Sequence, residues 1–209
     1  MARVSQEHLD ARRRQIIDGA ARCFARNGFH ATSMQDVLAE VGLSAGAVYR
    51  YFRGKDELIA AIADEAFSGI RVAFEEASRV TPPPTPDVLL GAVLRIFLEE
   101  RIPGADRQAF ARLIVQVWSE TMRDEKLFRT LSEGYNGMRE VWAELVEAYR
   151  ANGLMHADVP ADHLARTMIA IAQGFIAQQA LFGDVEAPIL EDGLRALMSM
   201  TPEQPGRRG

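Results

Sequence analysis

The stretch that decides the fold is residues 28–58, GFHATSMQDVLAEVGLSAGAVYRYFRGKDEL. Ser33, with an acid three residues after it, can cap a short helix that ends at Gly42. Ser44 can cap a second short helix, which we expect to span about residues 45–51. Two short helices joined by so tight a turn indicate a helix-turn-helix unit.

Helical patterns continue on both sides of this unit. Before it, apolar residues recur every four positions up to a stop at Asn27-Gly28, and after it a long helix is expected from Lys55. The run TPPPTP at residues 81–86 cannot be helical and is the clearest linker. Beyond it we expect five more helices, at about residues 87–102, 106–123, 125–152, 161–182 and 186–200. No alternating strand pattern is found, so the sequence predicts an all-α protein of about nine helices.

The composition is that of an ordinary globular protein, with 209 residues of which 48% are apolar and 25% charged. No run approaches the ~18–20 apolar residues that span a bilayer, and the first residues lack the apolar segment of a signal peptide. We therefore expect a cytoplasmic protein with no membrane partner. Cys23 is the single cysteine and the four histidines lie apart, so we expect no metal and no cofactor.

The charge is unevenly distributed along the chain. Residues 1–55 hold nine Lys and Arg against five Asp and Glu, whereas the rest of the chain accounts for the net charge of −5 by an acidic excess. A basic end on an acidic body is the asymmetry expected when one end of a protein meets phosphate.

Residues 28–58 also carry glycine, hydroxyl, aromatic and lysine positions at a fixed spacing. These are Gly28-Phe29, Thr32-Ser33-Met34, Asp36-Val37-Leu38, GLSAGAVYRYF at residues 42–52, and Lys55 with Glu57-Leu58. The pattern resembles the N-terminal signature of the tetracycline-repressor (TetR) family over about residues 10–62. The resemblance implies a three-helix DNA-binding domain at residues 1–55, a helical effector-binding and dimerisation domain at 56–200, and double-stranded DNA with a palindromic operator as partner. Residues 201–209 are expected to be a disordered tail.

The resemblance and the residue chemistry together predict a set of DNA contacts: Thr32, Ser33, Ser44, Ala45, Gly46, Ala47, Tyr49, Arg50, Tyr51 and Lys55. Several have a second interpretation. Gly46 suits close approach of the backbone either to DNA or to another helix. Tyr51 and Lys55 can bind phosphate, but Tyr51 can also pack inward and Lys55 can be an ordinary surface lysine. Arg50 can bind guanine or phosphate, and Arg12-Arg13-Arg14 can be a basic arm or a solvated helix face.

The last two expected helices are candidates for a dimer interface. Residues 161–182 are apolar nearly all round, and such a helix is buried on both faces. The resemblance implies that it pairs with its twin together with residues 186–200, through Leu164, Met168, Ile171, Phe175, Ile176, Phe182, Leu190, Leu194 and Leu197. Burial within one subunit is the alternative.

The middle helices concentrate aromatic residues and methionines. The resemblance implies an effector chamber here, with Phe97, Trp118, Met122, Tyr135, Met138, Trp142, Phe175 and Gln179 as candidate lining residues. An ordinary hydrophobic core is the alternative. Side chains that could orient a ligand are Gln116, Tyr135, Asn136, Gln173, Gln178 and Gln179. No basic cluster lies among them, so the sequence favours a neutral or cationic apolar effector over an anionic one.

These observations predict a sequence-specific DNA-binding transcriptional regulator, a repressor that a small apolar effector releases from its operator. The alternative is a TetR-like DNA-binding protein without such an effector, either chromosome-organising or regulated by a protein partner. The sequence shows no nucleophile–base pair, no metal-ligand spacing and no glycine-rich phosphate loop, so we do not expect an enzyme.

Overall fold

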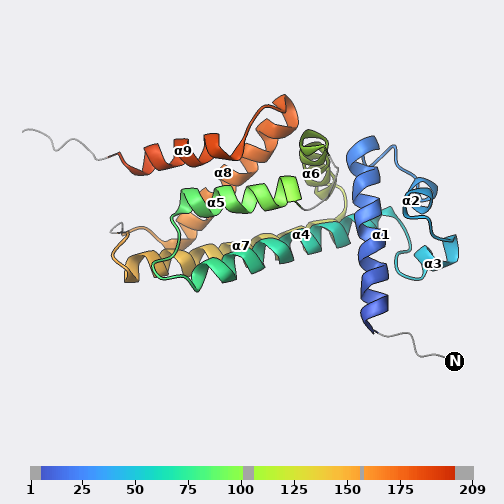
Figure 1. Ribbon diagram of the computed structural model, residues 1–209, viewed down its shortest axis with the longest axis horizontal. Helices are drawn as coiled ribbons and strands as arrows, with labels where there is room; N and C mark the ends of the chain where they lie inside the picture. Colours follow the sequence, from blue (N-terminus) through green and yellow to red (C-terminus); the bar gives the residue numbers. More distant parts are fainter. Residues whose placement is uncertain (1–5, 101–105, 156–157, 201–209) are drawn as a thin grey trace, which may run out of the picture.

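A computed structural model of the chain describes residues 6–100, 106–155 and 158–200, apart from the side chains of Ser78, Glu99 and Glu100 (Figure 1). Within these ranges the chain forms nine α-helices and no strand, which confirms the predicted all-α class. None of the described helices is long and apolar enough to cross a membrane. The tail predicted at residues 201–209 lies outside the described ranges.

The N-terminal part, which we call the head, consists of α1 (Gln6–Asn27), α2 (Met34–Val41) and α3 (Ala45–Tyr49). Helix α1 stands across one end of the molecule, and α2 and α3 lie on its outer side (Figure 1). The three helices share a core to which Phe24, Val37 and Val48 contribute fully buried side chains. Burial of such side chains is the main stabilising contribution for so small a unit.

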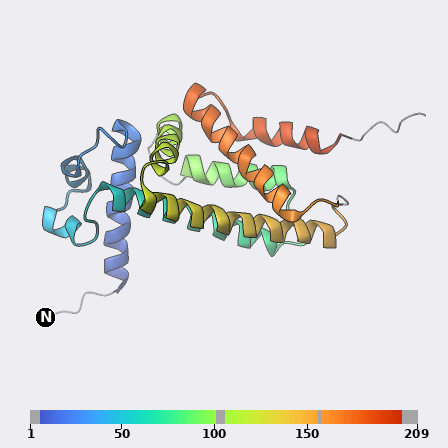
Figure 2. The same cartoon turned by 180° about the vertical axis from the view of Figure 1, so that it is seen from behind.

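The remaining helices form the body: α4 (Lys55–Ser78), α5 (Pro86–Arg95), α6 (Arg107–Thr121), α7 (Glu125–Ala151), α8 (Ala161–Phe182) and α9 (Ala187–Met198). The long helices α4 and α7 pack side by side along the molecule. Helix α8 crosses them diagonally and packs on α6 and α7 (Figure 2).

Two predicted helices differ from those observed. The helix expected at 87–102 is α-helical only to Arg95 and continues as a π-helical turn, η1 (Ile96–Glu100). The helix expected at 45–51 ends at Tyr49. The reason for the earlier end is local, because the chain turns after Val48 and carries Phe52 back into the core, where it is buried.

Helix α9 is attached to α5 by two ion pairs. Arg195 Nε lies 2.8 Å from the Asp87 carboxylate, and Arg95 Nη1 lies 2.7 Å from that of Glu191. Burial opposes ionisation of Asp87, but its polar neighbours Thr85, the Val88 amide and Arg195 outweigh it and hold the pKa of this carboxyl below its usual value. These pairs fix one side of α9 and leave its other side outward.

Candidate nucleic-acid interface and ligand cavity

Helix α3 is positioned by its cap and by one buried side chain. The Ser44 hydroxyl accepts a hydrogen bond from the Ala47 amide at 3.3 Å, which starts the helix. Val48 is fully buried and anchors the helix to the head. Since Val48 occupies the inner side of this short helix, the opposite side points outward. The exposed residues of this outward face are Ser44, Ala45, Gly46, Tyr49 and Arg50, with Ala47 half-buried.

Gly46 lies on this face with free space around it. A Cβ atom added there would meet no atom within 4 Å. Close packing against another helix of the subunit therefore does not explain the glycine, and the surface at this position is open to a partner outside the subunit. Glycine in the first turn of a helix costs about 1 kcal/mol relative to alanine, so its presence there has a cost that needs a reason.

Three of the predicted DNA contacts also make contacts within the subunit. Thr32 is buried, and its hydroxyl donates to the carbonyl oxygens of Gly28 at 2.7 Å and Cys23 at 3.3 Å, so it terminates α1. Tyr51 is half-buried and packs against the core, which favours the inward interpretation. Ser33 is exposed but caps α2: its amide donates to Asp36 at 2.7 Å, and hydrogen bonds from Ser33 lower the pKa of that carboxyl.

Lys55 binds carbonyl groups of the head. Its Nζ donates to the carbonyl oxygens of Phe29 at 2.9 Å and His30 at 3.3 Å, and lies 4.8 Å from the centre of the Phe29 ring. The cation at the start of α4 is thus placed by the turn between α1 and α2. This structural role was missed by the sequence interpretation, which considered only phosphate or an ordinary surface position.

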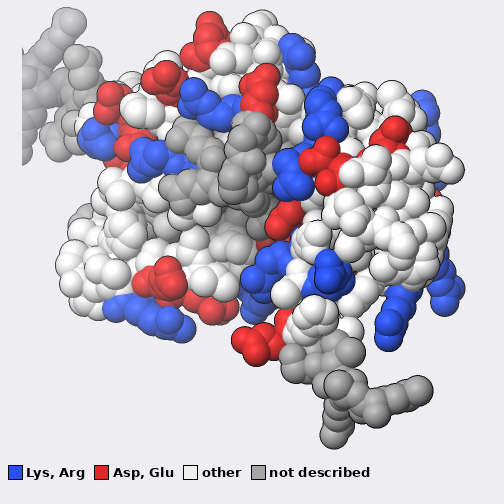
Figure 3. Space-filling view, turned by 45° about the vertical axis from the view of Figure 1, so that its right-hand side comes forward, with Lys and Arg blue, Asp and Glu red and all other residues white. Residues whose placement is uncertain are grey.

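The basic run at residues 12–14 is divided. Arg13 pairs with Glu65 of α4 at 3.1 Å, and its guanidinium lies 5.5 Å from the centre of the Phe52 ring, so it links α1 to its neighbours. Arg14 is exposed, whereas Arg12 is half-buried and donates to Gln15. Figure 3 shows Lys and Arg side chains distributed over this side of the molecule, with acidic side chains between them.

Helix α6 joins the body to the head at the turn that Lys55 also binds. Gln116 Oε1 accepts a hydrogen bond from the Phe29 amide at 3.0 Å, and Glu120 lies 2.9 Å from the His30 imidazole. Gly28, in the left-handed region with φ of 83°, lets the chain pass so close that an added Cβ would lie 3.4 Å from Gln116 Oε1. Gln116, predicted to orient a ligand, therefore connects the two parts of the molecule instead.

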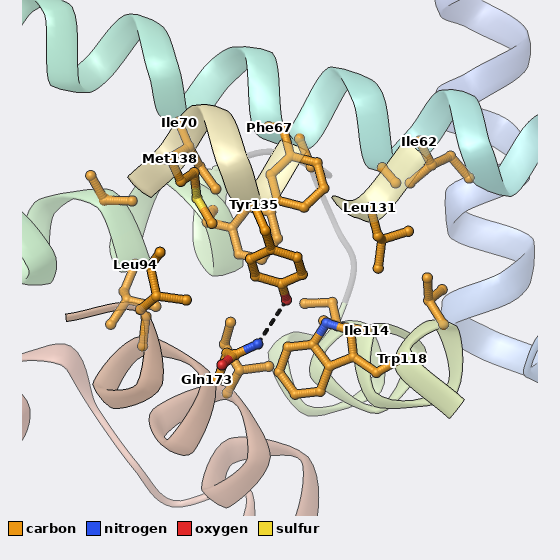
Figure 4. Close-up of a pocket in the computed structure, with 18 of the residues that line it drawn as sticks. Ile62, Phe67, Ile70, Leu94, Ile114, Trp118, Leu131, Tyr135, Met138 and Gln173 are labelled. Atoms are coloured by element: carbon orange, nitrogen blue, oxygen red, sulfur yellow. Dashed lines mark hydrogen bonds between the residues drawn. The ribbon is translucent and has the colours of Figure 1, made fainter. Parts of the chain in front are cut away.

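The body contains a partly open cavity of about 110 Å³ (Figure 4). Five of the eight predicted ligand residues line it: Phe97, Trp118, Tyr135, Met138 and Trp142. The other three do not, which corrects the predicted lining: Met122 is 79% exposed beyond the end of α6, and Phe175 and Gln179 are buried elsewhere on α8. The rest of the lining comes from α4, α5, α6, α7 and α8, chiefly as Ile, Leu, Val, Ala and Phe.

One polar pair lies among these apolar side chains. Gln173 Nε2 donates to the Tyr135 hydroxyl oxygen at 3.0 Å. Tyr135 also stacks edge to face with Phe67, with ring centres 5.3 Å apart, and Trp142 does so with Phe74 at 4.7 Å. Asn136, Gln178 and Gln179, which were also predicted to orient a ligand, are not among the cavity-lining residues.

The residues predicted for a dimer interface fall into two groups. Phe175, Ile176 and Leu194 are buried within the subunit, which corrects their assignment to an outer surface, and Leu164, Met168, Ile171 and Leu190 are half-buried. Phe182 and Leu197 are exposed. Met198, which the apolar pattern of residues 186–200 also includes, is exposed, as are two large apolar side chains on the same two helices that the prediction did not name: Leu181 and Ile189.

The head has three helices, of which the last is short, is anchored by a buried valine and turns its other side outward. Such a head joined to a larger helical body is typical of helix-turn-helix DNA-binding proteins. Comparison with known sequences agrees with this class. Residues 16–62 match the family described as bacterial regulatory proteins of the TetR family, and residues 91–201 match the C-terminal domain of BetI-type transcriptional repressors. The chain belongs to the TetR family of bacterial regulatory proteins.

Individual relatives are distant but match over most of their length. The HTH-type transcriptional repressor Rv1474c of Mycobacterium tuberculosis is 26% identical, over 86% of this chain and 88% of its own. Salmonella enterica GusR has a similar structure, with a TM-score of 0.71 and 25% identity over 95% of this chain and 100% of its own. FadR of Bacillus subtilis, solved in complex with stearoyl-CoA, has a TM-score of 0.71 at 16% identity over 88% of this chain and 96% of its own, a likeness of fold alone.

Proposed function

We propose that this TetR-family regulator represses transcription as a homodimer that binds a palindromic operator and leaves it when an apolar effector fills the body cavity. The observation that carries the DNA-binding part is the outward face of α3, with Tyr49 and Arg50 exposed on a helix that Val48 anchors. Helices of this kind enter the major groove, and a dimer reads two half-sites about 34–36 Å apart. The place of action is the cytoplasm, where a bacterial chromosome lies.

The dimer is proposed to form through α8 and α9. Leu181, Phe182, Ile189 and Leu197 are each more than 60% exposed in the single subunit. Large apolar side chains left exposed on two consecutive helices are typical of a contact surface. Gly174 lies on α8 with no atom within 4 Å of an added Cβ, which leaves room for a partner helix to approach.

Light scattering tests the dimer directly. A mass of about twice 23.2 kDa at micromolar concentration is expected. Leu197→Glu places a charge on the proposed contact and should give the monomer mass with helix content unchanged. A wild-type protein that scatters as a monomer would exclude this mode of DNA binding.

The release step is proposed to run through α6. Ile114, Val117 and Trp118 of this helix line the cavity, while Gln116 and Glu120 on the same helix hold the turn at Phe29 and His30. A ligand that displaces α6 therefore changes the position of the head. Release then follows by population shift, because DNA and ligand favour different positions of the same helix.

The experiment for DNA binding is fluorescence anisotropy on a panel that contains the DNA flanking the gene and shuffled sequences of the same composition. Wild-type protein is expected to bind a palindromic segment at least about a thousandfold more tightly than shuffled DNA. Arg50→Ala should reduce this ratio. Arg71→Ala, at an exposed arginine in the middle of α4, is the matched control and should leave the ratio unchanged. Equal binding to every sequence by wild-type protein contradicts the proposed function.

A further inference from the structure

Among the described residues that line the cavity, one hydrogen-bonded polar centre is made by residues from three helices. The Tyr135 hydroxyl of α7 accepts a hydrogen bond from Gln173 of α8, and the indole nitrogen of Trp118 of α6 points toward the same oxygen (Figure 4). The phenol oxygen is therefore occupied as an acceptor. Among the hydrogen bonds of the described residues, none uses the Tyr135 O–H as donor.

Tyr135 keeps its proton under physiological conditions. Burial raises the pKa of Tyr135 above its ordinary value near 10, and the hydrogen bonds from Gln173 and Trp118 offset only part of this rise. The neutral phenol can donate one hydrogen bond. A ligand in the cavity thus meets a donor that is already oriented by its two neighbours.

The described lining disfavours a charged ligand group inside the cavity on electrostatic grounds. Apart from Tyr135, Gln173 and the indole N–H groups of Trp118 and Trp142, every described residue that lines the cavity is aliphatic, aromatic or Met138. An ion moved from water into such surroundings loses its hydration without gaining a counter-ion. Aromatic faces attract cations, but this attraction compensates only a part of the lost hydration.

We propose that the cavity binds a small neutral molecule that is mainly hydrocarbon and carries one oxygen acceptor, such as a ketone, ester or ether, and that the Tyr135 hydroxyl donates a hydrogen bond to that oxygen. The inference rests on the proposed function only in treating this molecule as the effector. Gln173 and Trp118 are positioning residues, since they hold the Tyr135 oxygen and leave its hydrogen toward the ligand.

The test compares four probes of similar size by isothermal titration calorimetry on the full chain. Propiophenone carries one carbonyl oxygen, n-propylbenzene none, 3-phenylpropanoate a negative charge and phenyltrimethylammonium a positive charge. We expect propiophenone to bind most tightly, n-propylbenzene about 3- to 10-fold more weakly, and neither ion to bind detectably. The class is overturned if either ion binds as tightly as the ketone, or if no neutral probe binds.

Tyr135→Phe removes the donor and keeps the ring. It should weaken propiophenone about 3- to 10-fold and leave n-propylbenzene unchanged, so that the two neutral probes bind alike. Tyr149→Phe is the matched control on the same helix, because the Tyr149 hydroxyl donates to the Pro84 carbonyl at 2.7 Å outside the cavity lining. It should change neither affinity. An equal loss for both probes in Tyr135→Phe contradicts the assigned role of the hydroxyl.

Operator binding separates this inference from the proposed function. Propiophenone that binds the cavity and leaves operator affinity unchanged would contradict release by an effector but leave the ligand class standing. Operator release by a charged compound that binds the cavity would support release by an effector and contradict the proposed ligand class.

Discussion

The head and the body differ in how their functional residues are spread along the chain. The outward face of α3 consists of exposed residues that all lie between Ser44 and Arg50, on either side of one buried valine. The cavity of the body draws on residues between Ile59 and Ile176, from five α-helices and the π-helical turn η1. The head thus presents its recognising groups in one short segment, whereas the body assembles its groups from separate helices.

This difference reflects the partner of each part. DNA offers the same groove geometry to every protein, so one short arrangement of cap, glycine and exposed polar residues can be used repeatedly. A small apolar ligand is held mainly by shape and burial, which many combinations of aliphatic and aromatic residues provide. A short motif can therefore identify the head, and no short motif can identify the cavity.

The largest expected effect tests whether the two parts are also separate in stability. Phe24→Ala empties a fully buried site in the head and should lower the free energy of unfolding by about 3–5 kcal/mol. Because α1 packs on α4 and α6, we expect one cooperative transition for the whole chain. Both tryptophans lie in the body, so their fluorescence reports on it alone.

Urea denaturation followed by tryptophan fluorescence and by circular dichroism distinguishes the cases. The two curves should coincide and shift together in Phe24→Ala. Leu145→Ala, at a fully buried site of α7, is the counterpart in the body and should shift both curves as well. A fluorescence midpoint that Phe24→Ala leaves unmoved would show that the head unfolds independently.

The next effect concerns the exposed face of α3. Arg50→Ala should weaken operator binding by about 1–3 kcal/mol while changing binding to shuffled DNA much less, because a guanine contact is made only in the right sequence. Tyr49→Phe removes one hydroxyl and should weaken all sequences alike, as expected for a phosphate contact. If both variants act equally on every DNA, the two residues do not divide positioning and sequence reading in this way.

The helices of the head were predictable because their signals are local. Asn27-Gly28, Ser33 with Asp36, and Gly42 are stops and caps whose effect depends on immediate neighbours. Asn27-Gly28 and Gly42 end the expected helices, and Ser33 with Asp36 begins one. Phe97, Trp118 and Tyr135 were predictable as cavity residues because large side chains on inward helix faces lie in the interior between the helices. Met122 failed the same reasoning, because it lies just beyond the end of α6, where the helical phase no longer applies.

Lys55 and Gln116 could not be assigned from sequence for a different reason. Each binds backbone groups of the turn at Phe29 and His30, and Gln116 is 87 positions away from Phe29 in the chain. Lys55 binds two backbone carbonyls and Gln116 binds a backbone amide. Because nearly every residue has these groups, neither partner leaves a signature in the sequence. A lysine in the first helical turn, where the helix dipole disfavours a cation, was the single signal, and it indicated an anion equally well.

The third prediction separates these two roles of Lys55. Lys55→Met keeps the aliphatic stem over the Phe29 ring and removes the hydrogen bonds to the two carbonyls. We expect the unfolding free energy to fall by about 1–2 kcal/mol, as for other charge-assisted hydrogen bonds. The salt dependence of operator binding should stay unchanged. A slope of log affinity against log salt that decreases by about 0.9 per subunit would instead assign Lys55 to phosphate.

The fourth prediction addresses the connection between head and body. Gln116→Leu removes the acceptor for the Phe29 amide and should reduce the factor by which a bound ligand weakens operator binding, by about 0.5–1.5 kcal/mol of coupling. Gln108→Leu is the control on the same helix, since Gln108 contacts the Ala180 carbonyl of the body and not the head. Operator titrations with and without saturating propiophenone measure the coupling. An equal loss of coupling in both variants would show that the Gln116 hydrogen bond is not the connection between head and body.

The smallest effect is a pH dependence of the head. Glu40 of α2 lies 2.8 Å from Arg22 and 3.0 Å from Arg26 of α1, and hydrogen bonds from Arg22 and then Arg26 lower the pKa of this carboxyl. A carboxyl whose pKa is lower in the folded than in the unfolded state stabilises the fold above the unfolded value, about 4.3, and loses this contribution as the pH falls through the folded value. Stability of the wild type should therefore decrease from about pH 5 downward.

Glu40→Gln should be less stable than the wild type at pH 7, and its unfolding free energy should fall less steeply below pH 5. The difference between the two slopes corresponds to at most about one proton bound on unfolding. Urea midpoints measured at intervals between pH 7 and pH 3 give both quantities, and parallel curves for the two proteins would show that the Glu40 pairs do not link α1 to α2 energetically.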